Sequence, residues 1–264
     1  MERIIGVRYE EGLGHCGIPR ERLEKLEHRK ELCLLAARLL GNGRWRLRNE
    51  GVKLLGLCGC ERSAGLLLQV LTDRTPASRL HRFLGGDFRR TGFERRNALT
   101  GIALLGAWSE DVIDGVCTTL EDPYYEVRAA ACIWLRTVLS GVCEMAEPSE
   151  DDLGRLTDQV RKLLSDKNTE ARTQALHTWG CLASPAEVLE ACEPLLQHSA
   201  VRVREALLKA LHALLDRFPS DRELHAEMGR MLNGFLLSSV AMHPLYPLRA
   251  RYAKIRQKLG RNSS

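Results

Sequence analysis

The sequence is poor in aromatic residues and contains no long hydrophobic run. Phe, Trp and Tyr make up 5% of the 264 residues, whereas leucine and alanine are abundant. Strands draw on aromatic and β-branched residues and helices on leucine and alanine, so this composition favours an all-α fold. No apolar stretch approaches the roughly 20 residues needed to cross a bilayer, so we expect neither a membrane-spanning helix nor a membrane partner.

The chain also lacks the short motifs of common enzyme classes. It contains no GxSxG, HExxH or P-loop sequence, which mark serine hydrolases, zinc proteases and nucleotide-binding proteins. Its first residues, MERIIGVRYEEGLGH, do not contain the apolar segment of a secretory signal. These absences favour a cytoplasmic protein that is not an enzyme. A catalytic carboxylate on a helical scaffold would leave no local signature, so catalysis stays open.

The nine cysteines do not form a recognisable disulfide framework or metal motif. Their number is odd and they are scattered through helical patterns, which is typical of reduced thiols in a reducing compartment. Two local clusters contain metal-binding residue types, His15-Cys16 and Cys58-Gly-Cys60, and neither has a second pair at zinc-finger spacing. In a helix, Cys58 and Cys60 would point to different sides. We interpret the cysteines as core residues and predict no metal and no cofactor.

An internal repeat organises the chain. Five segments align without gaps on one arginine: LRNEGVKLLGLCG, RRNALTGIALLGA, VRAAACIWLRTVL, ARTQALHTWGCLA and VREALLKALHALL. The aligned arginines are Arg48, Arg96, Arg128, Arg172 and Arg204. Small or apolar residues follow three and seven positions later, as on one face of an amphipathic helix. Each unit is therefore predicted to contain a helix that begins near its arginine, and further helical patterns lie between these helices.

The spacing of the arginines reveals two insertions. The intervals are 48, 32, 44 and 32 residues, so a 32-residue period is lengthened twice, near residues 72–92 and 141–152. We divide the chain into an N-terminal arm (1–18), a repeat domain (19–242) and a basic C-terminal helix and tail (243–264).

The repeat resembles the HEAT repeat, specifically the short bacterial type also found in phycobilisome-lyase-like proteins. An Asp or Asn stands six positions before the arginine in three units, at Asn42, Asp122 and Asp166. Val-Arg dipeptides at 127–128 and 203–204, with the alanine and leucine that follow, complete the match. The second and fifth units depart from it with Arg90 and His198. The resemblance covers about residues 19–240 and implies a right-handed α-α superhelix of about five helical-hairpin repeats with helical caps.

Positive charge is concentrated in two segments. Residues 72–97 carry a net charge of +4 and residues 243–264 carry +6, so the remainder carries −5 within an overall +5. The first segment includes HRFLGGDFRRTGFERRN, which we interpret either as a solvated loop between repeats or as a binding site for acidic groups. The second contains a basic amphipathic helix that either binds nucleic acid or an anionic membrane surface, or caps the last repeat. The second insertion, CEMAEPSEDDLG, is acidic, and we interpret it as a linker followed by a helix start.

The arginines of the repeat have two interpretations. They either form a basic stripe on the concave surface that the HEAT resemblance implies, or they stabilise the stacking of neighbouring repeats. Trp45, which lies among arginines, also suits nucleic acid. The candidate partner-binding residues are Arg46, Arg48, Arg89, Arg90, Arg95, Arg96, Arg128, Arg172, Arg204, Arg249 and Arg251.

These observations favour a non-catalytic scaffold. It would bind a protein partner with an acidic or helical surface through its concave face and the basic insertion. One alternative is a nucleic-acid-binding protein, including one like the HEAT-like DNA glycosylases. Another is a lyase or chaperone-like subunit, as the repeat type implies.

Overall fold

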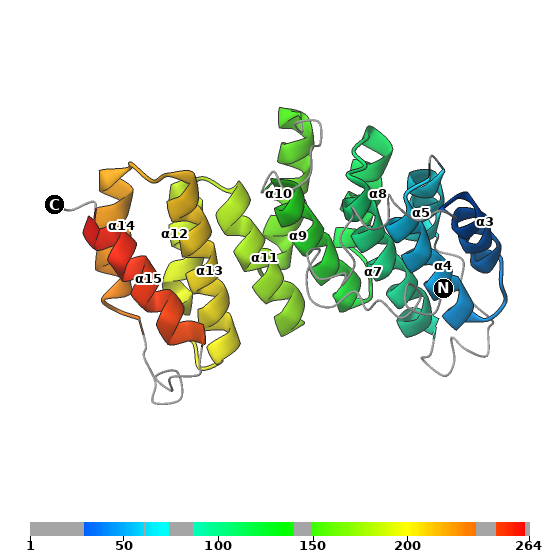
Figure 1. The fold of residues 1–264 in the computed structure, drawn as a ribbon. Coiled ribbons are helices and arrows are strands. Elements are labelled where there is room, and N and C mark those ends of the chain that lie inside the picture. The colour runs from blue at the N-terminus through cyan, green and yellow to red at the C-terminus, as the bar shows by residue number, and fades with distance from the viewer. Residues whose placement is uncertain (1–28, 61, 74–86, 140–148, 236–246, 262–264) are drawn as a thin grey trace. The chain divides into compact units, whose positions relative to one another are not determined.

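The protein is all-helical throughout the part that the structure describes. In this computed structural model, that part comprises residues 29–60, 62–73, 87–139, 149–235 and 247–261. These ranges contain twelve α-helices and one short 3-10 helix, with no strand, as the composition predicts (Figure 1). None of these helices is long and apolar enough to cross a membrane. The chain divides into two compact units, residues 1–156 and residues 157–264, with the boundary inside helix α10 (Glu150–Leu163).

Helices of the first unit pack in two rows. One row consists of α4 (Trp45–Cys58), α7 (Asp87–Leu105) and α9 (Tyr125–Leu139), where α7 contacts both neighbours (Figure 1). The other row contains α5 (Ser63–Thr72) and α8 (Glu110–Leu120), which pack against each other. In addition, α5 packs against α7, and α8 packs against α9. The remaining helix, α3 (Arg29–Leu40), packs against α4. Consecutive helices thus form the hairpins that the repeat predicts.

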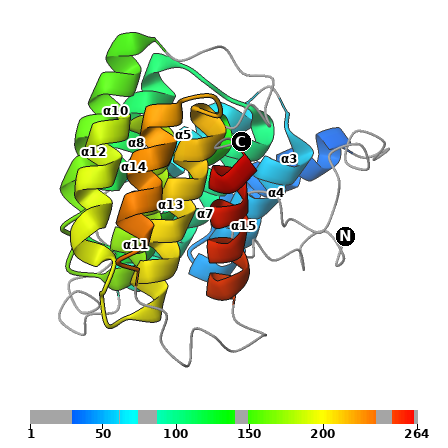
Figure 2. The same cartoon turned by 90° about the vertical axis from the view of Figure 1, so that its left-hand side faces the viewer.

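The second unit repeats this organisation. Its main row consists of α11 (Thr169–Leu182), α13 (Val201–Arg217) and α15 (Pro247–Arg261). Figure 2 shows α15, the last described segment of the chain, beside α13, and the two helices are in contact. The companions are α12 (Pro185–Cys192), which continues into a 3-10 helix (Glu193–Leu195) and packs on α13, and α14 (Arg222–Leu232), which packs on α15.

The repeat positions predicted to be apolar form the core. Seven residues after each aligned arginine the side chain is almost completely buried, at Leu55, Ala103, Leu135, Trp179 and Leu211. Three residues after it the chain is buried too, at Gly51, Leu99, Ala131, Ala175 and Leu207. The predicted amphipathic face is therefore confirmed in all five units.

The turns before four main-row helices, α4, α9, α11 and α13, are held by a recurrent side-chain hydrogen bond. Six positions before the arginine, the side chain accepts from the backbone N–H two residues later, at Asn42 (2.9 Å), Asp122 (2.8 Å), Asp166 (2.7 Å) and His198 (3.0 Å). Such a bond from a short polar side chain imitates a backbone turn. His198 departs from the Asp or Asn pattern, but its Nδ1 accepts the same hydrogen bond in place of the side-chain oxygen. The turn is therefore retained in the fifth unit, which departs from the Asp or Asn pattern.

Four aligned arginines occupy the fourth residue of their helices, as predicted, and the fifth does not. Arg96 lies nine residues after the start of α7 at Asp87. Residues 87–92, which the sequence analysis assigned to the first insertion, are thus helical. Asp87 stands at the helix N-terminus, where the macrodipole favours a carboxylate, and no proline follows within the helix. The Gly85-Gly86 pair and Phe83 lie outside the described residues, as does the N-terminal arm.

The second basic segment forms a cap on the second unit. Leu248, Ile255 and Leu259 of α15 are buried, and the Tyr252 ring stacks on Phe235 with a centroid distance of 5.3 Å. The predicted apolar stripe therefore packs on α13 and α14. Of the two alternatives for this helix, the structure therefore shows the one in which it caps the last repeat.

Candidate functional site

The arginine of the first repeat joins two neighbouring hairpins. Arg48 donates from Nη1 to the carbonyls of Asn42 and Gly43 at 3.1 and 3.2 Å. Its Nη2 lies 3.0 Å from Oε1 of Glu94, which belongs to α7. Burial raises the pKa of Glu94 even though Arg48 acts in the opposite direction. The Arg48 guanidinium is therefore engaged within the protein, in the structural role that was the alternative to partner binding.

A buried ion pair connects α7 with the turn before α9. Arg95 donates from Nε to Oδ2 of Asp122 at 2.7 Å and from Nη2 to Oδ1 at 3.0 Å. The two side chains are 5% and 0% exposed. Oδ1 also accepts the N–H of Tyr124, while the Asp122 carbonyl accepts Nη1 of Arg128 at 2.6 Å. Asp122 thus links α7 to the turn before α9 and to α9 itself, and both arginines are engaged within the protein.

The other predicted arginines differ in accessibility. Arg204 is 1% exposed, so it is a core residue of the second unit. Arg172 and Arg251 are half-buried and Arg249 is exposed. The side chains of Arg89 and Arg90 lie outside the described residues. The structure thus does not present the aligned arginines as one basic stripe.

A ladder of charge pairs runs between the repeats of the first unit. The aligned arginine of one repeat pairs with a glutamate two positions before the arginine of the next. Arg48 pairs with Glu94 at 3.0 Å, and Arg96 donates from Nη1 to Oε2 of Glu126 at 2.6 Å. At the same position, the first repeat carries Arg46 instead of glutamate. Arg46 is exposed and forms no ion pair with a described residue.

Aromatic side chains line the same ends of the three helices. Trp45, Phe93 and Tyr125 stand three positions before the aligned arginine in consecutive repeats. The Trp45 and Phe93 rings stack at 6.4 Å between centroids, and Tyr124 meets Phe93 edge-on at 5.9 Å and Tyr125 at 5.4 Å. All four rings are half-buried. We call Trp45, Phe93, Tyr124 and Tyr125 the aromatic row.

The aromatic row is tightly packed at its centre. A Cβ on Gly92 would lie 2.1 Å from Cδ1 of Tyr124, so the absence of a side chain there lets the tyrosine ring lie against α7. Burial and a hydrogen bond to Glu126 raise the pKa of Tyr124, which keeps its hydroxyl protonated. Arg96 lies over the Phe93 ring at 4.9 Å. The centre of the row is therefore fixed by the protein itself.

Positive charge is accessible at the α4 end of the aromatic row. The Arg46 guanidinium carbon lies 5.8 Å from the Trp45 ring centroid, and Arg44, also exposed, precedes the helix. Neither guanidinium forms an ion pair with a described residue. Partly exposed aromatics next to cations can bind carboxylates together with apolar groups. Trp45, Arg44 and Arg46 therefore form the accessible part of the candidate site.

Sequence reasoning identified Trp45 and its arginines but missed the rest of the aromatic row. The signal was present as an aromatic at the same repeat position in the first three units. Thr169 and Val201 take this position in the other two units. The row is thus a feature of the first compact unit alone.

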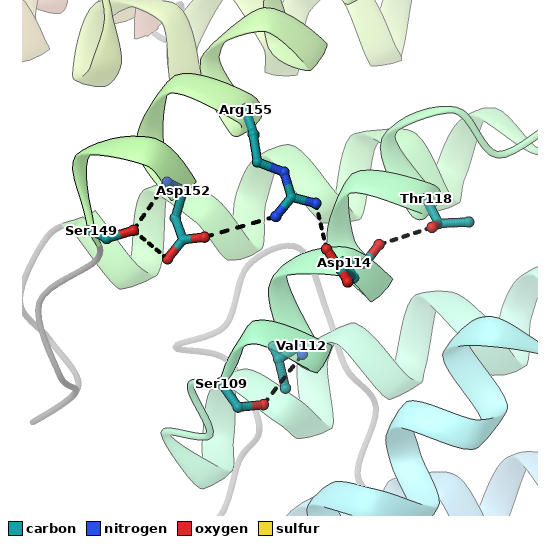
Figure 3. A network of polar contacts seen from close by, with 7 residues as sticks. All are labelled: Ser109, Val112, Asp114, Thr118, Ser149, Asp152 and Arg155. Carbon is teal, nitrogen blue, oxygen red and sulfur yellow. Dashed lines mark hydrogen bonds and ion pairs between the residues drawn. The ribbon is translucent and has the colours of Figure 1, made fainter.

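Ser149 and the acidic residues that follow it form the start of α10, as predicted. Ser149 Oγ accepts the N–H of Asp152 at 3.1 Å and donates to its carboxylate at 2.7 Å. Figure 3 shows Arg155 of α10 extending between Asp152 and Asp114, the latter on α8. Both partners of the Arg155–Asp114 pair are about half exposed. This network joins helices at the surface.

Comparison with known proteins does not identify a relative. No protein-family model matches the chain, and no curated protein matches it. Within the described ranges, no group of three or more His, Cys, Asp or Glu side chains is arranged to hold a metal ion.

Proposed function

We propose that the protein is a non-catalytic helical-repeat scaffold of the HEAT-like type, whose hairpins stack into an α-α superhelix and which binds a protein partner. The aromatic row carries this proposal, because it places aromatics of consecutive repeats beside two exposed arginines. Side chains already fixed by the protein lose little conformational freedom on binding, so a preformed surface of this kind favours recognition.

The chemistry of the site favours an acidic segment with an apolar anchor. Arg44 and Arg46 would pair with carboxylates, and the exposed part of Trp45 would pack against the apolar side chain. Arginine and tryptophan are the residue types most enriched where interfaces concentrate their binding energy. The two cations would also accelerate association with an acidic partner, in a manner that salt suppresses.

Fluorescence anisotropy tests this proposal directly. The probe is a labelled amphipathic peptide that alternates glutamate with leucine, titrated with the full-length protein. Arg44→Ser/Arg46→Ser and Trp45→Ala are each expected to weaken binding by about tenfold or more, because removing an interface anchor costs about 1–2 kcal/mol or more. The charge-matched control is Arg222→Ser/Arg230→Ser, which removes two exposed arginines from α14. Equal weakening by both double variants would reject the site in favour of non-specific charge attraction.

Nucleic acid is the second candidate, favoured by the Arg46–Trp45 contact. A guanidinium beside a π-face suits phosphates and bases alike. Titrating a labelled single strand and a labelled duplex from about 50 to 200 mM salt tests it, because each neutralised phosphate releases counterions. If nucleic acid is the partner, Arg44→Ser/Arg46→Ser should reduce the single-strand salt slope by about 1.4, from two contacts at about 0.7 each. Absence of binding at low salt would remove this candidate.

A further inference from the structure

Three thiols, one of them distant from the other two in the sequence, lie close together beside the turn between α4 and α5. Cys33 lies on α3, Cys58 is the last residue of α4, and Cys60 lies in the turn. Gly59 adopts a left-handed conformation, with φ of 57°, and ends the helix between the two later cysteines. This turn brings Cys60 into hydrogen-bonding contact with Cys33, 27 residues earlier in the chain.

The three cysteines differ in their access to solvent. Cys58 is 0% exposed and Cys33 is 6% exposed. Cys60 is only half-buried, because it lies in the turn rather than in a helix. Cys60 is therefore the most exposed of the three residues, whereas Cys33 and Cys58 are covered by packed helices.

Hydrogen bonds distinguish Cys60 from an inert core thiol. Ser63, at the start of α5, accepts the Cys60 N–H through Oγ at 3.0 Å, and its Oγ lies 3.1 Å from the Cys60 sulfur. At this distance the Ser63 hydroxyl can donate to the sulfur when Cys60 is a thiolate. Burial opposes ionisation, but the hydrogen bonds from Ser63, Cys33 and backbone amides outweigh it and lower the pKa of Cys60.

The neighbouring thiol has the opposite character. Burial, followed by its hydrogen bond to Cys60, raises the pKa of Cys33 to about 12. The proton therefore stays on Cys33, and negative charge is favoured on Cys60. A stabilised thiolate that is partly accessible, with a second thiol in contact, is the arrangement of a redox-reactive cysteine pair.

We propose that Cys60 is a peroxide-reactive thiol and that Cys33 resolves its oxidised form as an intramolecular disulfide. In the first step the Cys60 thiolate attacks one oxygen of hydrogen peroxide. The O–O bond breaks, Cys60 becomes a sulfenic acid, and hydroxide leaves. In the second step the Cys33 sulfur attacks the Cys60 sulfur. The S–O bond breaks, and the departing hydroxyl leaves as water with the Cys33 proton.

The oxidation product would covalently join α3 to the turn after α4. Both elements belong to the first described hairpin, which also contributes Trp45, Arg44 and Arg46 to the candidate site. The pair therefore offers a covalent means of fixing the hairpin next to that site. The thiol chemistry itself does not depend on the proposed function.

Mass spectrometry after peroxide treatment tests the pair in the full-length protein. Cys16 and Cys143, which lie outside the described residues, are first replaced by serine. The protein is exposed to hydrogen peroxide, the remaining thiols are alkylated, and peptides are mapped without reduction. We expect a crosslinked Cys33–Cys60 peptide, and a sulfenic acid on Cys60 that dimedone traps when Cys33 is replaced by serine.

Cys192 is an internal control in the same sample. It is completely buried, and burial raises its pKa to about 12. Since the pKa of Cys60 is lowered and that of Cys192 is raised, a larger fraction of Cys60 is thiolate near neutral pH. Cys60 should therefore be alkylated faster than Cys192. Cys58→Ser should leave the crosslink unchanged.

Several outcomes would overturn the inference. A crosslink from Cys58 to Cys33 or to Cys60, in place of the Cys33–Cys60 crosslink, would show that the proposed pairing is wrong. If Cys60 were alkylated no faster than Cys192, Cys60 would not be a reactive thiol. Because both results come from the protein with its native pair intact, they do not depend on whether a Cys33 or Cys60 variant folds.

Discussion

Removing the Asp122 carboxylate should destabilise the first unit more than any surface change. Asp122→Ala leaves the buried Arg95 guanidinium without its counter-charge and the Tyr124 N–H without its acceptor. Breaking a buried pair from one side costs about 3–5 kcal/mol, and side-chain exposures of 5% and 0% place this pair in that class. With a urea dependence of about 2 kcal/mol per M, the unfolding midpoint should fall by about 2 M.

Urea unfolding followed by far-UV circular dichroism measures this loss, and hydrogen exchange of α7 and α9 locates it. Arg95→Met should lower the free energy of unfolding by a similar amount, because it leaves the buried Asp122 carboxylate without its counter-charge. The double variant Arg95→Met/Asp122→Leu should lose less than either single variant, since apolar residues can replace a buried pair at little cost. Arg155→Met, which breaks a half-exposed pair, should leave the midpoint unchanged (Figure 3). A loss below about 1 kcal/mol for Asp122→Ala would refute the assigned role of the pair.

Three further predictions concern packing, capping and ionisation. Gly180→Ala would place a Cβ 2.4 Å from the Ala210 carbonyl oxygen, so α11 and α13 must separate and thermal unfolding should show a loss of about 1–3 kcal/mol. Asn168→Ala removes the acceptor for two N–H groups at the start of α11 and should cost about 1 kcal/mol in the same assay. Because burial raises the pKa of Glu94, its contribution to stability is present at about pH 4 and is lost as the pH rises through the folded-state pKa. The urea midpoint of Glu94→Gln relative to wild type should therefore increase toward about pH 7, and a constant difference would contradict the raised pKa.

The sequence predicted the hairpin units because burial follows helical periodicity. Positions three and seven after the arginine are buried in every repeat, so one apolar face per helix was enough to place the core. The C-terminal stripe was predicted for the same reason. Local capping was also readable, since Ser149 and the acidic residues after it favour a helix start without help from distant parts of the chain.

What escaped prediction depends on contacts between distant residues. Glycine and arginine dominate the first turns of α7 and therefore predict an interruption, yet Gly92 is required there by the Tyr124 ring. The Arg95–Asp122 pair escaped because Arg95 precedes the aligned position and its partner lies 27 residues later. The Cys33–Cys60 contact escaped because Cys60 lies outside the helix in which it was expected.

The ladder of charge pairs explains why the accessible cation is not an aligned arginine. Each ladder contact joins the arginine of one repeat to a glutamate in the next, as Arg48–Glu94 and Arg96–Glu126 do. The first described hairpin has no described hairpin before it. A glutamate at its ladder position, two residues before Arg48, would therefore have no aligned arginine to pair with. A glutamate there would be an unpaired negative charge, whereas the chain has Arg46, which leaves a cation at the end of the ladder. Stacking of the repeats thus engages Arg48 and Arg96, whereas Arg46, which stands at the glutamate position, remains available for a partner.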